Sequence, residues 1–450
     1  MHDEALAYFP TLSEHGQRML EFLREHPAAP RYRNQSGHRL LAHEVEDLRH
    51  FVREIQAAPV GWPRGEHPAW LGAHVEQVSR EVPAWRALGR LPARFEELPT
   101  TCRADLAADI ARHVPDPVPV ERMICFTTTG TTGHPLLVAS HPVVAARYLA
   151  FHLRALRRFG IALRHRRGQV GVVLLGLQRR CFTYVSVTPL MDDSGLAKIN
   201  LHPDDWRDPA DRATYLDALD AEVIAGDPIS FGELLRLPVR TRPRALLSVG
   251  MMLSRGLRDE LQQRFGCPVL DLYSMNEAGP IGVFDGAAGG HVLLQPRMYV
   301  EILDPQGRPV PEGQRGEVTL TGGFNFCLPL LRYRTGDHAA LVHGADGPVL
   351  KDLQGRAPVR FRTAAGGWVN NIDVTHALQG WPLAQYTLHQ QADAAVRLRL
   401  PATAMTHAPD LREALRALLG DLPIDVELLA GDDKVRQYTS DLQGARSAAA

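Results

Sequence analysis

The chain has 450 residues, a length at which we expect at least two domains, or one large domain with a small one. Hydrophobic residues make up 45% of it and the formal net charge is -1, which gives no overall attraction to nucleic acid or to an anionic membrane. The five cysteines are widely spaced and include no CxxC pair, which argues against a disulfide framework or a zinc site. The sequence opens without an apolar leader, and its longest apolar run, VGVVLLGL, is too short to span a bilayer, so we expect a cytoplasmic protein.

Four stretches follow one another along the chain. Residues 1–95 carry helical periodicity, as in LLAHEVEDLRHFVREIQAA, and predict a helical N-terminal layer. From about residue 120 to 285, apolar strand candidates alternate with capped helices such as SRGLRDELQQRFG, which predicts α/β units. Residues 291–353 consist of short strands with turns between them and predict a β-rich subdomain. Residues 357–450 predict a compact α+β module, so we place a large domain at residues 1–356.

The segment FTTTGTTGHP, Phe126 to Pro135, lies between a strand-like run and a helix-like run. Backbone amides unblocked by side chains, followed by a helix start, form an anion nest, and nearby hydroxyls can donate to phosphate oxygens. A P-loop NTPase would need a lysine where this chain has His134, so that class is excluded. Taken alone, the segment is equally typical of a surface turn.

Four further segments accompany this loop: ELPTTCRADL from Glu97, LDLYSMNEAGPIG from Leu270, LPLLRYRTGDHAAL from Leu328, and DLQGR ending at Arg356. In that order and at those spacings, the chain resembles the adenylate-forming superfamily, and within it the phenylacetate-CoA ligase branch. That branch has an LPFTTK-DL lead-in, an SSGTTGKP loop, a YGxTE element, an RYRTGD element and a GR hinge. The resemblance covers roughly residues 90–440. It implies an α/β fold: a large N-terminal α/β domain with a β-rich subdomain, and a small, mobile C-terminal α+β lid domain.

Such enzymes let a carboxylate attack the α-phosphate of ATP, release pyrophosphate, and pass the acyl group to a nucleophile. The resemblance implies that Glu277 orients Mg²⁺, that Asp337 accepts from the ribose hydroxyls, and that Arg356 lies at the hinge near ribose and phosphate. It implies that Tyr273 stacks on adenine, although an aromatic residue after a strand is also typical of a core. The residues that match the phosphate loop are Thr128, Thr129, Gly130, Thr131, Thr132 and Gly133.

The chain departs from the branch at several of these positions. His134 replaces the usual lysine and is charged only when protonated, with a reference pKa of about 6.5. Asn276 replaces the threonine before the glutamate, and its amide can still bond phosphate or a substrate carboxylate. The sequence after Arg356 lacks the usual acidic hinge, which puts rotation of the lid in question. Lys434 is the candidate for the adenylation lysine, with a solvated tail lysine as the equal alternative.

The acid-binding residues are predicted from ISFGELL and SVGMML, namely Phe231, Gly250, Met251 and Met252. A phenyl ring and two thioethers suit a flat aromatic acid, but a methionine pair beside a strand is also typical of a core. The arginine-rich stretch from Arg147 to Arg167 predicts a solvated face, with docking of coenzyme A or of an acidic carrier protein as the alternative.

We therefore expect ATP, Mg²⁺ and a small carboxylic acid as ligands, with coenzyme A as the acceptor. An acyl carrier protein, an amine or nitrite is the alternative acceptor. A degenerate nucleotide-binding scaffold without catalysis is a second alternative, and neither a nucleic acid nor a membrane partner is expected. The sequence does not indicate an oligomeric state.

Overall fold

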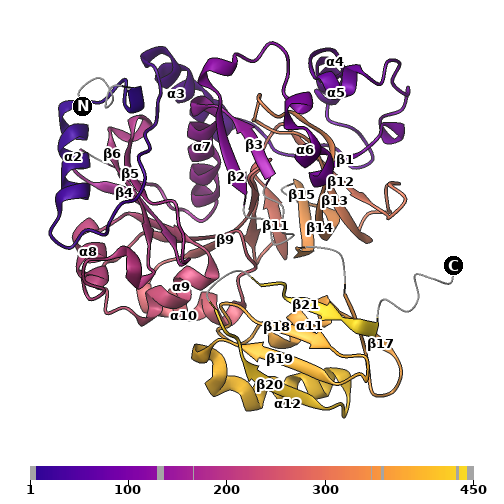
Figure 1. Cartoon of the computed structure of the whole chain (residues 1–450). Helices are drawn as coiled ribbons and strands as arrows, with labels where there is room; N and C mark the ends of the chain where they lie inside the picture. Colours follow the sequence, from indigo (N-terminus) through magenta and orange to yellow (C-terminus); the bar gives the residue numbers. More distant parts are fainter. Residues whose placement is uncertain are drawn as a thin grey trace.

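The computed structural model describes residues 7–128, 136–165, 167–345, 347–355, 359–431 and 435–442. In this part of the chain, one sheet of thirteen strands forms the large domain, and a separate small sheet lies in the C-terminal unit (Figure 1). No helix of the described residues is long and apolar enough to cross a membrane.

One half of the large sheet is parallel. Its parallel strands, in spatial order, are β9 (Val269–Met275), β8 (Ala245–Val249), β7 (Val223–Gly226), β4 (Val170–Gly176) and β6 (Ser194–Asn200). The antiparallel strand β5 (Tyr184–Thr188) forms the edge. These strands are short apolar runs because helices cover both of their faces, so alternate side chains enter two separate cores. This arrangement confirms the prediction of α/β units.

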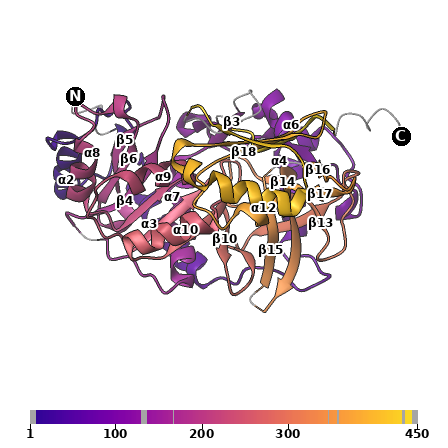
Figure 2. The ribbon, with the colours of Figure 1, turned by 90° about the horizontal axis from the view of Figure 1, so that it is seen from below.

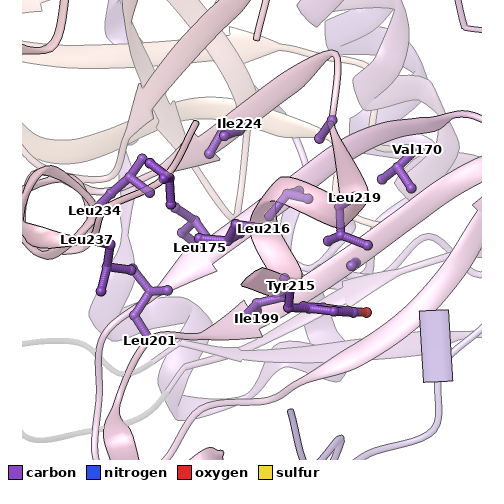
Figure 3. Packing of buried hydrophobic residues seen from close by; sticks show 14 of the residues in the cluster. Val170, Leu175, Ile199, Leu201, Tyr215, Leu216, Leu219, Ile224, Leu234 and Leu237 are labelled. Carbon is purple, nitrogen blue, oxygen red and sulfur yellow. The ribbon is translucent and has the colours of Figure 1, made fainter. Parts of the chain in front are cut away.

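Different helices cover the two faces. The first core includes residues of α2 (Glu14–Glu25), α8 (Asp211–Leu219), α9 (Pro228–Arg236) and α10 (Arg255–Phe265). Figure 3 shows part of this core around Tyr215 and Leu216. The second core includes residues of α3 (Ala42–Ala57) and α7 (Pro142–Arg158). Helix α10 begins and ends as the sequence predicts: Ser254 accepts from the Leu257 amide, and Gly266 is left-handed.

The other half of the same sheet is mainly antiparallel. It continues from β9 through β10 (Gly279–Asp285), β11 (Gly290–Leu293), β15 (Gly347–Gln354), β14 (Leu330–Gly344), β13 (Arg315–Gly322) and β12 (Met298–Leu303). The short strand β1 (Thr101–Cys102) pairs with β14, and α6 (Arg103–Ala108) follows it directly. Helices α4 (Leu71–Glu81) and α5 (Pro83–Arg86) lie earlier in the chain. The β-rich segment predicted over residues 291–353 therefore extends the α/β sheet, with a third core of its own.

A separate hairpin flanks the threonine-rich loop. Strand β2 (Ile124–Thr128) pairs antiparallel with β3 (Leu136–Ser140), and Thr128 lies opposite Leu136. The prediction of a helix directly after the loop is wrong. Leu136 and Val138 alternate into the third core as strand residues do, and α7 begins only at Pro142, where His141 accepts from the Val143 amide.

The C-terminal unit has its own core around a sheet ordered β20 (Ile424–Leu428), β19 (Val396–Leu400), β18 (Thr387–Gln390) and β21 (Tyr438–Ser440). Its helices are α11 (Asn371–Leu378) and α12 (Ala408–Leu419), and a two-stranded hairpin precedes them, β16 (Arg360–Arg362) with β17 (Trp368–Asn370). Figure 2 shows this unit from below, in front of the large domain. The predicted α+β unit is confirmed, whereas the boundary at residue 356 stays a prediction because Arg356 lies outside the described residues.

Candidate active site

Glu277 lies in a tight turn between two strands of the large sheet. The turn joins β9 to β10, and Met275 pairs with Gly279 across it. Gly279 has φ of +68°, and a Cβ there would lie 2.4 Å from Cε1 of Phe324. Only glycine accepts both that backbone conformation and that close approach. This turn therefore holds Glu277 at a fixed place at the end of β9.

The Glu277 carboxylate is 5% exposed and is held by two donors from distant segments. The Tyr333 hydroxyl in β14 donates to Oε1 over 3.1 Å, and Nη1 of Arg103, the first residue of α6, lies 3.5 Å from the same oxygen. Burial and the nearby carboxylate raise the pKa of Tyr333 far above its ordinary value, so the hydroxyl stays protonated and donates. A buried carboxylate with two donors is oriented rather than solvated.

A second pair lies near this turn, two strand residues before it in β9. The Tyr273 hydroxyl in β9 donates to Oδ2 of Asp337 in β14 over 2.8 Å. Burial and Asp337 raise the pKa of Tyr273 well above its ordinary value. The Asp337 amide in turn donates to Oγ1 of Thr335. The structure thus brings together the two residues that the resemblance assigns to adenine and ribose.

The strand that follows the threonine-rich loop packs in the same hydrophobic core as the Glu277 turn. Residues 129–135 are outside the described residues, which leaves out the predicted phosphate-loop positions Thr129, Gly130, Thr131, Thr132 and Gly133. Strand pairing of Thr128 with Leu136 joins the two ends of the loop. Leu136 packs in the same core cluster as Ala278, the residue after Glu277. Strand β3, which follows the loop, therefore shares a core with the turn that carries the carboxylate, and it also contacts α6, whose first residue is Arg103.

Other predicted site residues occupy different settings. Gly250, with φ of +75°, follows β8, whose last residue Val249 pairs with Leu272 next to Tyr273. Met251 is partly exposed, Met252 is 37% exposed, and Asn276 is exposed in the Glu277 turn. Arg356 and Lys434 lie outside the described residues.

Phe231 requires a correction. Its side chain is 0% exposed and belongs to the first hydrophobic core, where α9 packs on the parallel strands. The second residue of ISFGELL, Ser230, is also 0% exposed, and its hydroxyl donates to Asp227 at the start of α9. The helix turns this segment toward the core, so Phe231 does not line an accessible acid pocket in this structure.

Sequence reasoning missed two residues of the site. Arg103 is in the lead-in segment and Tyr333 is in RYRTGD, but neither motif shows which side chain its residues contact. They lie 174 and 56 residues from Glu277. Two signals were available in the sequence: Arg103 is a permanently charged side chain in the lead-in motif, and Tyr333 is an aromatic residue four positions before Asp337.

Comparison with known proteins assigns the family. Residues 73–326 match the AMP-binding enzyme family, and because this is more than half of the chain, the chain belongs to that family. The predicted resemblance is thereby confirmed.

The phenylacetate-coenzyme A ligases of Pseudomonas putida and Escherichia coli (strain K12) are similar to parts of the chain, with 35% identity over 97 residues and 32% over 95. These matches cover 21% and 20% of this chain and about a fifth, 22%, of the length of each relative. A 2-hydroxyisobutyryl-CoA ligase crystallised in the postadenylation state with an acyl-AMP shares the fold. The superposition covers 90% of this chain and 91% of that one, with a TM-score of 0.60 at 18% identity.

Proposed function

We propose that this protein is an ATP-dependent ligase that activates a carboxylic acid as its acyl-adenylate. The observation that carries the proposal is the placement of Glu277. Tyr333 and Arg103 hold this carboxylate, the Tyr273–Asp337 pair lies beside it, and strand β3 after the threonine-rich loop shares the core of its turn. Membership of the AMP-binding enzyme family supports the same activity.

In the proposed reaction, a carboxylate oxygen of the acid bonds to the α-phosphorus of ATP. The bond from that phosphorus to the bridging oxygen breaks, and pyrophosphate leaves. The protein's task is to hold the polyphosphate and align the acid. The loop amides and hydroxyls would bind phosphate oxygens. Asp337 would accept hydrogen bonds from the ribose hydroxyls in place of the one that it accepts from Tyr273. Arg103 would add a permanent positive charge near the phosphates, a charge that the sequence's replacement of lysine by His134 supplies only when that ring is protonated.

The residues present fit magnesium. No group of three or more His, Cys, Asp or Glu side chains that could hold a metal ion exists among the described residues. Magnesium in nucleotide sites is commonly bound by one or two carboxylates together with the substrate phosphates, and Glu277 supplies such a carboxylate. When bound, the ion would neutralise phosphate charge and favour departure of pyrophosphate.

For the finer assignment, we propose an aromatic acid and coenzyme A. The names of the relatives from Pseudomonas putida and Escherichia coli describe ligases of phenylacetate and coenzyme A. Gly250 and Met251 follow Val249, which pairs with Leu272, the neighbour of Tyr273, and a polarizable thioether there would suit contact with a flat acid. An acyl carrier protein is the alternative acceptor.

The test is carboxylate-dependent exchange of pyrophosphate into ATP over a panel of aromatic and aliphatic acids. Glu277→Gln should lower the exchange rate by at least about 100-fold, because loss of one electrostatic group at such a site costs about that much. Asp337→Ala should raise the KM for ATP. The exposed Glu260 of α10 gives a matched control, Glu260→Gln, which should exchange at the wild-type rate. Measurable ATP binding without exchange for any acid would favour the non-catalytic scaffold instead.

A further inference from the structure

The β16–β17 hairpin of the small unit presents a basic and aromatic face to solvent. Arg360 pairs with Asn370 across the hairpin, and Arg362 pairs with Trp368. Because directly opposite residues share a face, these four side chains lie on one side, and all four are exposed. Trp368 is 43% exposed, a large apolar surface to leave in water.

The opposite face of the hairpin fixes it to the small unit. Phe361 lies between the two arginines in sequence and is 0% exposed in the core of that unit. The buried Gln390 side chain accepts from the Arg362 amide over 2.7 Å and donates to the Arg362 carbonyl over 2.9 Å. The exposed face therefore rests on a well-held backbone, which lowers the entropic cost of binding a ligand.

The two hairpin arginines differ from other arginines of the small unit. Among the described residues, neither Arg360 nor Arg362 has a carboxylate partner within ion-pair distance. In the same unit, Arg397 and Arg399 both pair with Glu427, at 3.0 and 2.9 Å. Two adjacent uncompensated guanidinium groups favour an anionic ligand, and phosphate suits their planar donors.

The arginines of α7, predicted as a solvated or docking face, are mostly engaged within the large domain. Arg147 donates to the Phe324 carbonyl over 2.9 Å, Arg154 to the Ala58 carbonyl over 2.8 Å, and Arg158 to Asp285 over 2.6 Å. These contacts leave the hairpin as the better placed basic surface for an acceptor.

The hairpin also lies within reach of the candidate active site. A Cβ at Gly355 would lie 3.5 Å from Oδ1 of Asp337, and Arg360 follows five residues later. Five residues span at most about 17 Å, so the basic face of the hairpin cannot be far from the Asp337 carboxylate. In Figure 1, β17 lies at the right-hand side of the small unit, beside β21, with the strands of the large domain above that unit.

We propose that this hairpin binds the 3′-phosphoadenosine diphosphate end of coenzyme A, with the adenine on the Trp368 indole and phosphates on Arg360 and Arg362. An indole face and guanidinium groups together match a phosphorylated purine, since bases stack on aromatic side chains while arginine binds phosphate. The site would leave the pantetheine arm free to extend toward the acyl-adenylate. The proposal rests on the proposed function and names its acceptor.

The first test measures binding of adenosine 3′,5′-bisphosphate by calorimetry, in the presence of saturating AMP to fill the adenylate site. The wild-type protein should bind the probe, and both Arg360→Gln/Arg362→Gln and Trp368→Ala should weaken binding at least tenfold. The matched control, Arg397→Gln/Arg399→Gln, removes the same charge from the same unit and should bind as wild type. Absence of wild-type binding, or equal affinity in the variants, overturns the proposal.

The second test separates this site from adenylation. Carboxylate-dependent pyrophosphate exchange should be unchanged in the hairpin variants, whereas the KM for coenzyme A should rise at least tenfold and the KM for pantetheine, which lacks the nucleotide, should not change. Equal increases for both thiols overturn the proposal. Loss of exchange in the wild type would reject the proposed adenylation, while the binding measurement would still decide whether the hairpin holds the nucleotide.

Discussion

At the scale of single residues, two tyrosine hydroxyls orient the two carboxylates of the candidate site. Tyr333 donates to Glu277, and Tyr273 donates to Asp337. Burial raises the pKa of both tyrosines, which keeps them as donors at any physiological pH. The carboxylate oxygens that accept these two bonds therefore need no water. Glu277 is preoriented for a cation and Asp337 for a ribose.

Tyr333→Phe tests this orientation. The substitution removes the hydroxyl that donates to Glu277 while keeping the ring in its fully buried place. We expect the exchange rate to fall about tenfold and the Mg²⁺ concentration for half-maximal rate to rise, because the carboxylate loses one of its two donors. Tyr32→Phe removes a comparable hydroxyl, bonded to Tyr215 over 2.8 Å outside the site, and should leave both quantities unchanged. Identical kinetics of Tyr333→Phe and the wild type would contradict the orienting role.

Asp271 links protonation to stability. It is 8% exposed in β9, 3.7 Å from Arg258 and 3.8 Å from His291. Burial raises the pKa of Asp271 to about 7, although Arg258 acts in the other direction, and burial lowers the pKa of His291 to about 3, so that ring is neutral. Because the folded pKa exceeds the unfolded value, this group contributes stability that is complete below about pH 4 and is lost as pH rises to about 7.

Asp271→Asn should remove this dependence. Relative to the wild type, its free energy of unfolding should rise between about pH 4 and 8, by up to a few kcal/mol. Urea denaturation across that range measures the difference. The exposed Asp259→Asn in α10 should follow the wild-type profile, and a parallel profile for Asp271→Asn would show that the buried carboxyl does not titrate as stated.

At the scale of elements, the β9–β10 turn depends on its glycine. Gly279→Ala adds a Cβ 2.4 Å from the Phe324 ring at φ of +68°, whereas Gly266→Ala at the end of α10 has φ of +65° and open space. We expect Gly266→Ala to cost about 1 kcal/mol and Gly279→Ala about 2–4 kcal/mol, the excess coming from overpacking. Thermal or urea unfolding measures both, and equal losses would mean that Phe324 moves aside freely.

At the scale of the whole molecule, the small unit docks on the first turn of α10. The Gly256 amide donates to the Gln379 carbonyl over 3.0 Å, and Oγ of Ser254 donates to the Leu383 carbonyl over 3.2 Å. A Cβ at Gly256 would lie 2.3 Å from the carbonyl carbon of Trp381, so this contact is between backbones. The close approach of the two units at this point therefore requires a residue without a side chain at position 256.

Gly256→Ala should loosen this docking without unfolding either unit, because the clash is with backbone that cannot yield by a rotamer change. We expect faster amide hydrogen exchange over residues 379–384 and unchanged protection in β18 and β19. Gly72→Ala in α4, where a Cβ meets open space, is the control and should exchange as wild type. Unchanged protection over 379–384 in Gly256→Ala would contradict the docking contact.

Local patterns were sufficient for much of this fold. The caps of α10 at Ser254 and Gly266, the alternating α/β units and the order of the motifs all follow from residues close in sequence. They also sufficed for the family, because five short segments in register are specific together. The structure brings Tyr273 and Asp337 into contact, whereas the roles of Glu277, Tyr273 and Asp337 stay predictions.

Only the tertiary structure decided the rest. It placed Phe231 in a core, put a strand after the threonine-rich loop, and joined the β-rich segment to the α/β sheet. It also brought Arg103 and Tyr333 to Glu277 across 174 and 56 residues. The physical reason is that periodicity and turn chemistry record a residue's local geometry, whereas the partner of a buried charge is set by how distant strands stack and which side chains then share one enclosed space.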